Sequence, residues 1–346
     1  HSKRLRGLDK NRRIRTDFFR NQKFPGGYFF SAFDFDYYSY KVHFRAETEA
    51  LNKELIMLNV ADAALEDAGF TRGQPRNVAV IISAKQNLFQ LHFYLNAYLP
   101  EFIRKALKEA DIALDEASIQ QLIAIARNAI IPRGAGLEFI ATGIGPIIAT
   151  RIASAWDFTG PVFKLCDLEN SFIRSMELAR LLLQDPSVDA VLLGAIDADP
   201  LLEILVWYGK YGEAWGLDLQ TVKFAEGAAA MVVQSSDRIA ENDMNIYANV
   251  ESIHLSRENP SVPSTAAFPS ADRFSECFQD TLTQADITPA QIGYLELSGN
   301  CLTPPSNEYI KRLDDHFIFH MDQPVPCGSA VFNFGYSFMA SQAVSI

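Results

Sequence analysis

Runs of consecutive apolar residues alternate along this chain with longer stretches in which apolar residues recur at helical spacing. Residues 77–83, 190–197 and 228–236 form the clearest apolar runs, and their length is typical of buried strands. Residues 246–256 and 292–299 predict two further strands, near the surface or at the end of an element. We therefore expect several short strands, most of them covered on both faces.

Three stretches between these runs have the pattern of a helix, namely residues 54–70, 145–158 and 273–287. The first is predicted to stop at Gly69, because glycine commonly closes helices. Strands that alternate with helices of this length predict an α/β fold with largely parallel sheets. A helix followed by a strand recurs in both parts of the chain, which suggests an internal duplication.

Composition and charge exclude several kinds of function. The chain has 346 residues, 48% of them hydrophobic, and its formal net charge of -11 argues against binding to nucleic acid. Its four cysteines and six histidines follow no metal-ligand spacing. No apolar stretch approaches the ~18 residues of a membrane helix, and no signal peptide opens the sequence. We expect a cytoplasmic protein with no membrane span and no metal site.

The stretch from Lys164 to Leu183 has the layout of a turn that presents a nucleophile: a short apolar strand, a polar corner and an amphipathic helix. Glu169 occupies the corner, and Cys166 comes three residues earlier. A carboxylate near a helix N-terminus is stabilised by about 0.3–1 kcal/mol. Glu169 is therefore interpreted as a helix-capping acid, as a group that contacts a substrate, or as a nucleophile.

Two further expectations concern the side chains around this corner. The Cys166 thiol lacks a neighbouring base, so we expect it to be inert. The helix after the corner is predicted to bury one face, formed by Phe172, Met176, Ala179 and Leu183.

Motifs around this corner resemble those of the β-ketoacyl synthases of fatty acid and polyketide synthases. In that family a T-G-P motif and a strand lead to the catalytic cysteine, eight residues after the proline; here "DFTGP" (157–161) places Glu169 at that position. "FAEGAAAMVV" (224–233), "IGYLELSGN" (292–300) and "GSAVFNFGYSF" (328–338) resemble other family motifs. The resemblance covers most of the chain.

The resemblance implies an α/β, thiolase-like fold: two duplicated halves with mixed or parallel sheets in an αβαβα layered arrangement. The first half, with the remnant of the nucleophile turn, would span residues 1–240. The second would span residues 241–346, and we expect it to be incomplete.

The same resemblance implies that the catalytic groups of the family are missing here. In the family a cysteine takes the acyl chain, two histidines stabilise the developing negative charge, and a lysine fixes one histidine. The corresponding positions hold Glu169, Ser298, Tyr336 and Val331. Decarboxylation without the cysteine would still need both histidines, so we expect no catalytic residue and a chain that is inactive alone.

A narrower resemblance is to chain-length factors, the inactive partners in ketosynthase heterodimers, and among them to the chain-length-factor-like domain of polyunsaturated fatty acid synthases. It is carried by "LENSFIRSMELARLL" (168–182), "GGYFFSAFDFDYYSYKV" (26–42) and "WDFTGP" (156–161). That domain usually keeps a histidine where Tyr336 stands, which weakens any argument for residual chemistry.

This narrower resemblance implies a domain that pairs, as a heterodimer or pseudo-dimer, with an active ketosynthase across the strand at residues 162–168. The domain would bind no cofactor, would work with an acyl carrier protein that carries phosphopantetheine, and would shape the acyl tunnel of its partner. Phe163, Leu165 and Phe172 are candidate tunnel or interface residues, with plain core as the alternative. Two other functions stay open: a structural docking domain of a megasynthase, and a Glu169-dependent decarboxylase or hydrolase of acyl thioesters.

Overall fold

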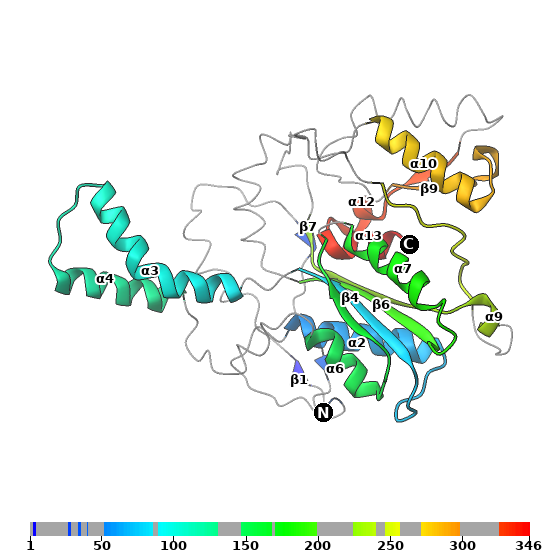
Figure 1. Cartoon of the computed structure of the whole chain (residues 1–346), viewed down its shortest axis with the longest axis horizontal. Coiled ribbons are helices and arrows are strands. Elements are labelled where there is room, and N and C mark those ends of the chain that lie inside the picture. The colour runs from blue at the N-terminus through cyan, green and yellow to red at the C-terminus, as the bar shows by residue number, and fades with distance from the viewer. Residues whose placement is uncertain are drawn as a thin grey trace.

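A four-stranded mixed sheet lies at the centre of the described part of the chain, with strand order β5-β4-β6-β8 (Figure 1). The computed structural model describes residues 3–4, 27–28, 34–35, 40, 52–85, 89–130, 147–167, 170–198, 224–239, 246–256, 271–297 and 325–346. Strands β4 (Val78–Ala84), β5 (Val162–Leu165) and β6 (Ala190–Asp197) are parallel, whereas β8 (Gly227–Val233) runs antiparallel to β6. The α/β class and the largely parallel sheet are thus as predicted.

The remaining described elements are short strands and helices. The short strands are β1 (Lys3–Arg4), β2 (Gly27–Tyr28), β3 (Asp34–Phe35), β7 (Phe224–Ala225), β9 (Leu295–Glu296) and β10 (Cys327–Gly328). The α-helices are α2 (Asn52–Asp67), α3 (Phe89–Glu109), α4 (Glu116–Ile130), α6 (Ile147–Trp156), α7 (Ser171–Leu182), α9 (Ser236–Ile239), α10 (Ala271–Ala285), α12 (Ala330–Phe334) and α13 (Ser341–Ser345). The 3-10 helices η3 (Pro289–Gln291) and η4 (Phe338–Ala340) lie in the last part of the chain.

Two apolar layers cover the sheet, one on each face. Helices α2 and α6 pack on one face, where Trp156, Leu55 and Ile152 are almost fully buried. Helix α7 and the segment η4–α13 pack on the other face, around Phe172, Ile81 and neighbouring side chains (Figure 1). All residues of β4 and β6 are buried. This explains their continuous apolar sequence, because a strand covered on both faces has no solvent side to fill with polar residues.

Local sequence signals set the ends of these helices. Helix α2 stops where Gly69 takes a positive φ of 76°, and the Phe70 amide donates to the Leu65 carbonyl at 2.9 Å, as in a Schellman motif. Gly160 precedes β5 at a close backbone approach, since an added Cβ would lie 2.3 Å from the Val78 carbonyl oxygen. The predicted helical stretches 54–70, 145–158 and 273–287 therefore appear as α2, α6 and α10, slightly shifted at their ends.

Two sequence predictions about strands are corrected by the structure. Residues 246–256 form no strand; the segment runs beside α10, where the Ser252 hydroxyl donates to the Thr281 carbonyl at 2.9 Å. Of residues 292–297, only Leu295–Glu296 form a strand, and residues 298 and 299 lie outside the described residues. The apolar residues of the first segment serve packing instead, since Ile253 contacts the core around α7.

Helices α3 and α4 form a hairpin that the sequence patterns did not predict. In Figure 1 it stands apart from the central sheet, and an ion pair between Arg104 and Glu116 joins its two helices at 2.5 Å. The hydrogen bond from Arg104 lowers the pKa of Glu116 to about 2. The hairpin shares few contacts with the core, so a search for core-facing patterns misses it.

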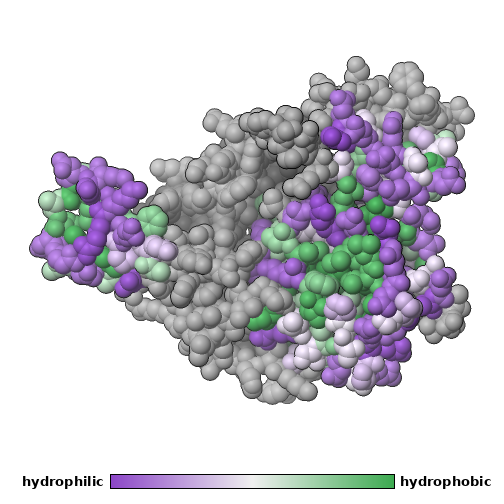
Figure 2. All heavy atoms as spheres, viewed as in Figure 1, coloured by the Kyte–Doolittle hydropathy of each residue, from purple (hydrophilic) through white to green (hydrophobic). Residues whose placement is uncertain are grey.

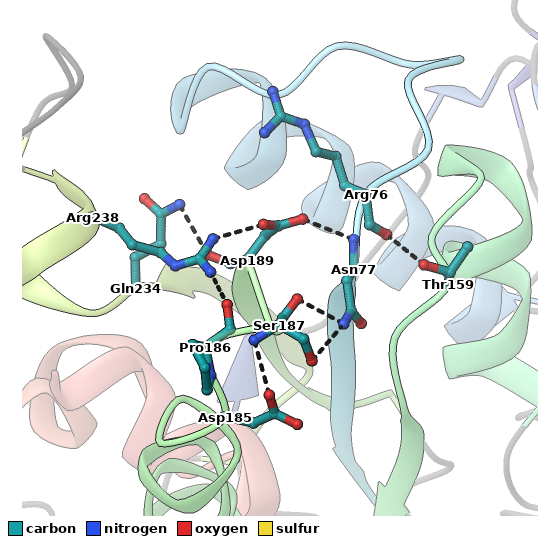
Figure 3. Close-up of polar contacts among 9 residues, drawn as sticks. All are labelled: Arg76, Asn77, Thr159, Asp185, Pro186, Ser187, Asp189, Gln234 and Arg238. Atoms are coloured by element: carbon teal, nitrogen blue, oxygen red, sulfur yellow. Dashed lines mark hydrogen bonds and ion pairs between the residues drawn. The ribbon is translucent and has the colours of Figure 1, made fainter.

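The loops at the amino end of the sheet are joined by a cluster of polar contacts, drawn in Figure 3. The Asn77 amide donates to the Asp189 carboxylate at 2.9 Å, and the Asp189 amide donates back to the Asn77 carbonyl at 2.9 Å. Arg238 binds the other oxygen of Asp189 at 2.7 Å, and the Asn77 side chain donates to the Ser187 carbonyl at 2.7 Å. This amino-end cluster fixes where β4 and β6 begin relative to one another.

Candidate functional site

The candidate site lies at the opposite end of the sheet, where β5, β4 and β6 end beside the N-terminus of α7. In parallel α/β sheets, ligands and catalytic groups gather at the carboxyl ends of the strands. The sequence predicted β4 and β6 as buried strands, and the stretch from β5 into α7 as a nucleophile-like turn. We call this region, together with residues 336–341, which pack on it, the carboxyl-end site.

The corner that precedes α7 is described on both of its sides. Helix α7 begins after Asn170, whose amide donates to the Asp167 carbonyl at 3.1 Å, and the Asp167 carboxylate binds Arg174 Nε at 2.7 Å. Leu168 and Glu169 lie outside the described residues, so the three interpretations of Glu169 stay predictions. The predicted buried face of α7 is confirmed: Phe172, Met176 and Ala179 are buried, and Leu183 is partly buried.

Buried hydroxyl groups connect the start of α7 to the neighbouring elements. Ser83 Oγ on β4 and Ser175 Oγ on α7 lie 2.8 Å apart, and both residues are fully buried. The Ser171 hydroxyl accepts a hydrogen bond from the Asp167 amide at 2.7 Å and lies 2.9 Å from Met339 Sδ. The first turn of α7 is thereby packed against a segment about 165 residues further along the chain.

That distant segment contains Tyr336, one of the four residues that stand where the family has a catalytic group. Its side chain is 1% exposed, its carbonyl accepts a hydrogen bond from the Ala225 amide at 2.9 Å, and its ring lies 4.6 Å from that of Phe338. Gly335 directly before it has a φ of 86°, a value that favours glycine. The fold thus brings the Tyr336 segment to the first turn of α7, which follows the nucleophile-like corner.

Val331, at the position of the family's lysine, is 5% exposed within the short helix α12. Helix α12 begins beside the β9–β10 pair, where the Ala330 amide donates to the Glu296 carboxylate at 2.6 Å. This bond, with one from the Tyr294 hydroxyl at 2.8 Å, keeps the pKa of Glu296 below its usual range, although partial burial opposes the shift. Ser298, two residues beyond Glu296, lies outside the described residues.

An ion pair that the motif analysis did not identify lies at the carboxyl-end site. Lys85, just after β4, binds the carboxylate of Asp197, the last residue of β6, with Nζ–oxygen distances of 2.9 and 3.1 Å. The Lys85 ammonium also lies 4.3 Å from the centre of the Phe338 ring, and Lys164 donates to the Lys85 carbonyl at 2.7 Å. The sequence did contain a signal for this pair: a charged residue, Lys85 or Asp197, stands at the end of each of the apolar runs that form β4 and β6.

The three candidate interface or tunnel residues differ in their surroundings. Phe163 is 36% exposed on β5, an end strand of the described sheet. Leu165 is partly buried against the core around α7, and Phe172 is fully buried within that core. Phe172 is thus placed as a core residue, whereas Phe163 is partly exposed. Cys166 is exposed beyond the end of β5, and its inertness stays a prediction.

The described residues offer little that could bind a metal or carry proton-transfer chemistry. Among them, no group of three or more histidine, cysteine or acidic side chains is arranged to hold a metal ion. None of the helices in this part of the chain combines the length and apolar character needed to cross a membrane. No described residue at the carboxyl-end site is a histidine; the polar groups described there include the serine hydroxyls, the Lys85–Asp197 pair and the Asp167–Arg174 pair.

Comparison with known proteins gives a relative in sequence and several in structure. The chain is 27% identical over 308 residues to a subunit of the polyunsaturated fatty acid synthase from a Thraustochytrium species, covering 86% of this chain but 13% of that protein. The chain therefore spans a small part of the length of this relative. No protein-family model matches the chain.

The structural relatives include several ketosynthases. The PfaC keto synthase–chain length factor matches with a TM-score of 0.68 and 24% identity, over 97% of this chain and 34% of that one. The oxazolomycin ketosynthase domain OzmH KS7 of Streptomyces albus matches with a TM-score of 0.62 and 18% identity, over 90% of this chain and 50% of that one. A ketosynthase from module 6 of the bacillaene synthase of Bacillus subtilis gives 0.61 and 18%, with the same coverage.

These matches confirm the predicted fold and resemblance. The αβαβα layering and the division at residue 240 stay predictions, because the described strands of the second half are too short to define a second sheet. The chain has a thiolase-like fold, the fold of the ketosynthases it matches, and in sequence it is similar to part of a polyunsaturated fatty acid synthase.

Proposed function

We propose that this chain is a non-catalytic chain length factor that pairs with an active ketosynthase and shapes its acyl tunnel in polyunsaturated fatty acid or polyketide synthesis. The observation that carries the proposal is that Tyr336 and Val331 are buried, at the positions where the family has a histidine and a lysine. Neither side chain can supply the charge that stabilises an enolate, a contribution of several kcal/mol. The similarity to part of a polyunsaturated fatty acid synthase favours this assembly.

The proposed pairing surface is the outer edge of β5. An end strand leaves backbone N–H and C=O groups available on one side, and β5 is such a strand in the described sheet. Phe163 on this strand exposes 36% of its surface. Large aromatic side chains of this kind often contribute much of the binding energy at protein interfaces. On the face shown in Figure 2, hydrophobic residues gather where Figure 1 places the sheet between α6 and α7.

In this proposal the chain itself holds no cofactor. Phosphopantetheine would arrive on an acyl carrier protein that serves the active partner, and this chain would act by the shape and apolar character of the surface that it presents. Of the three candidate tunnel residues, Phe163 is the one we assign to the interface; Leu165 and Phe172 would support it from within the core.

Pairing can be tested by co-purifying the chain with an active ketosynthase from the same source. We expect a stable complex that Phe163→Asp weakens at least about tenfold, because a buried unpaired carboxylate costs well over 1.4 kcal/mol at an interface. Leu181→Asp is the matched control, since Leu181 is 50% exposed on α7 and outside β5. Equal effects of the two variants, or no complex at all, would refute the proposed surface.

Activity measurements separate the alternatives. The complex should make products whose chain length changes when side chains at the β5 edge are replaced, whereas a structural docking domain would leave product length unchanged. The isolated chain should release no carbon dioxide from a malonyl carrier protein. Release that disappears in Glu169→Ala would instead identify the chain as a decarboxylase.

A further inference from the structure

The backbone at Phe338 has an unusual conformation. Its φ is 42°, in the left-handed region, where a bulky residue other than glycine is rare and costs on the order of 1–2 kcal/mol. The neighbouring Ser337, Met339 and Ala340 are all buried. Such a conformation persists only when the surroundings hold it in place, and it points to a specific role for the residue.

Lys85 is the group best placed to hold Phe338. Its ammonium lies between the Asp197 carboxylate, 2.9 Å away, and the Phe338 ring, whose centre is 4.3 Å away. Asp197 is 3% exposed and the Lys85 side chain 23%, so this charge pair is largely withdrawn from water and the attraction between the ammonium and the ring is stronger than on an open surface.

The segment that contains Phe338 covers the first turn of α7. Met339 Sδ lies 2.9 Å from Ser171 Oγ, and the Gln342 side chain accepts a hydrogen bond from the Ile173 amide at 3.5 Å. Tyr336 fills the space beside it. If the segment moved away, the first turn of α7 and the ends of β4 and β6 would be uncovered.

We propose that Lys85 is a positioning residue: held by Asp197, it locks the segment Tyr336–Met339, against its own backbone strain, over the carboxyl end of the sheet. The lock keeps the first turn of α7 and the ends of β4 and β6 covered by this chain's own side chains. The inference concerns the closed state of the chain and does not depend on the proposed pairing surface.

Hydrogen exchange of the full chain tests the lock directly. In Lys85→Met, which keeps the length of the side chain and removes its charge, the Ser337 and Ala340 amides should exchange about tenfold faster, because local opening becomes easier. Amides within β4 and β6 should keep their protection. Lys105→Met is the control for the same chemical change, at a lysine 70% exposed on α3. Unchanged exchange of Ser337 and Ala340 in Lys85→Met would overturn the proposal.

A second variant shows whether Lys85 acts through Phe338. Phe338→Gly removes the ring that Lys85 contacts and relieves the strain of the positive φ. Adding Lys85→Met to this variant should therefore change the exchange rate of the Ala340 amide by less than about twofold. An equally large effect of Lys85→Met in the two backgrounds would mean that Lys85 stabilises the region in another way and would refute the lock. Thermal melting of all variants identifies any that lose the global fold, and Phe338→Gly, which relieves strain, is expected to remain folded.

Discussion

The two ends of the central sheet carry polar groups of different kinds. At the amino end, the cluster around Asn77 and Asp189 joins loops through partly exposed side chains, each with close partners (Figure 3). At the carboxyl end, Ser83, Ser175 and Asp197 are almost fully buried, and Asp197 pairs with a lysine whose side chain is 23% exposed. The same strands therefore begin in a surface network and end in a buried one.

The difference shows which end is organised for something beyond folding. Polar groups at the amino end close the loops that lead into the strands, a task that stability alone explains. Polar groups at the carboxyl end carry a desolvation cost, and there they meet a strained backbone at Phe338. Buried polar clusters with strain are typical of functional sites. This end retains that character although histidine is absent from its described residues.

The largest expected effect concerns Glu54, a buried acid in the first turn of α2. Helices α2 and α6 each end shortly before a strand begins, so their first turns lie towards the carboxyl end of the sheet. Burial raises the pKa of Glu54 to about 7, although Arg151, 3.1 Å away, opposes the shift. The folded state therefore favours the protonated acid, and its stability falls as the pH rises from about 4.5 through 7.

Urea denaturation at two pH values checks this expectation. Between pH 5 and pH 8 the chain should lose about 2–3 kcal/mol more unfolding free energy than Glu54→Gln, whose amide does not titrate. Glu116→Gln is the control, because the pKa of Glu116 is held at about 2 and this group stays charged throughout that range. If the chain and Glu54→Gln responded to pH in parallel, the buried acid would not titrate as inferred.

A medium effect is expected at the amino end, for Asp189→Ala. The change removes the acceptor for the Asn77 amide and for Arg238. Because the carboxylate is 26% exposed, water replaces part of what is lost, and we expect a cost of about 1–2 kcal/mol, measured by urea denaturation. A loss below about 0.5 kcal/mol would show that the cluster does not hold the strand starts together.

The smallest effect is expected for the two hydroxyls at the carboxyl end. Ser83→Ala removes the hydroxyl that lies 2.8 Å from Ser175 Oγ, which keeps its hydrogen bond to the Ser171 carbonyl at 2.9 Å, and should cost about 1 kcal/mol. Adding Ser175→Ala removes the second hydroxyl as well, so the double variant should be less destabilised than the sum of the two single variants. A double-mutant cycle measures this coupling, and strict additivity would mean that the two hydroxyls do not interact.

Sequence patterns predicted the central elements because buried positions are occupied by apolar residues, whose spacing can be read from the sequence. Strand β6 was predicted with the observed bounds, and α2, α6, α7 and α10 were predicted to within a few residues. The segment 246–256 and the hairpin α3–α4 were not predicted correctly. The first packs its apolar residues on other elements without strand pairing, and the second lies outside the core, so neither follows the simple patterns of a buried strand or a core-facing helix.

The sequence by itself determined the residue types at the former catalytic positions, because Val331 and Tyr336 could be counted from the motifs that surround them. Only the tertiary structure decided what those residues meet. It buried Tyr336, set Met339 against Ser171, and brought Lys85 into contact with Asp197 and Phe338. These contacts join segments more than 100 residues apart, and chain folding, rather than local spacing, brings such segments together.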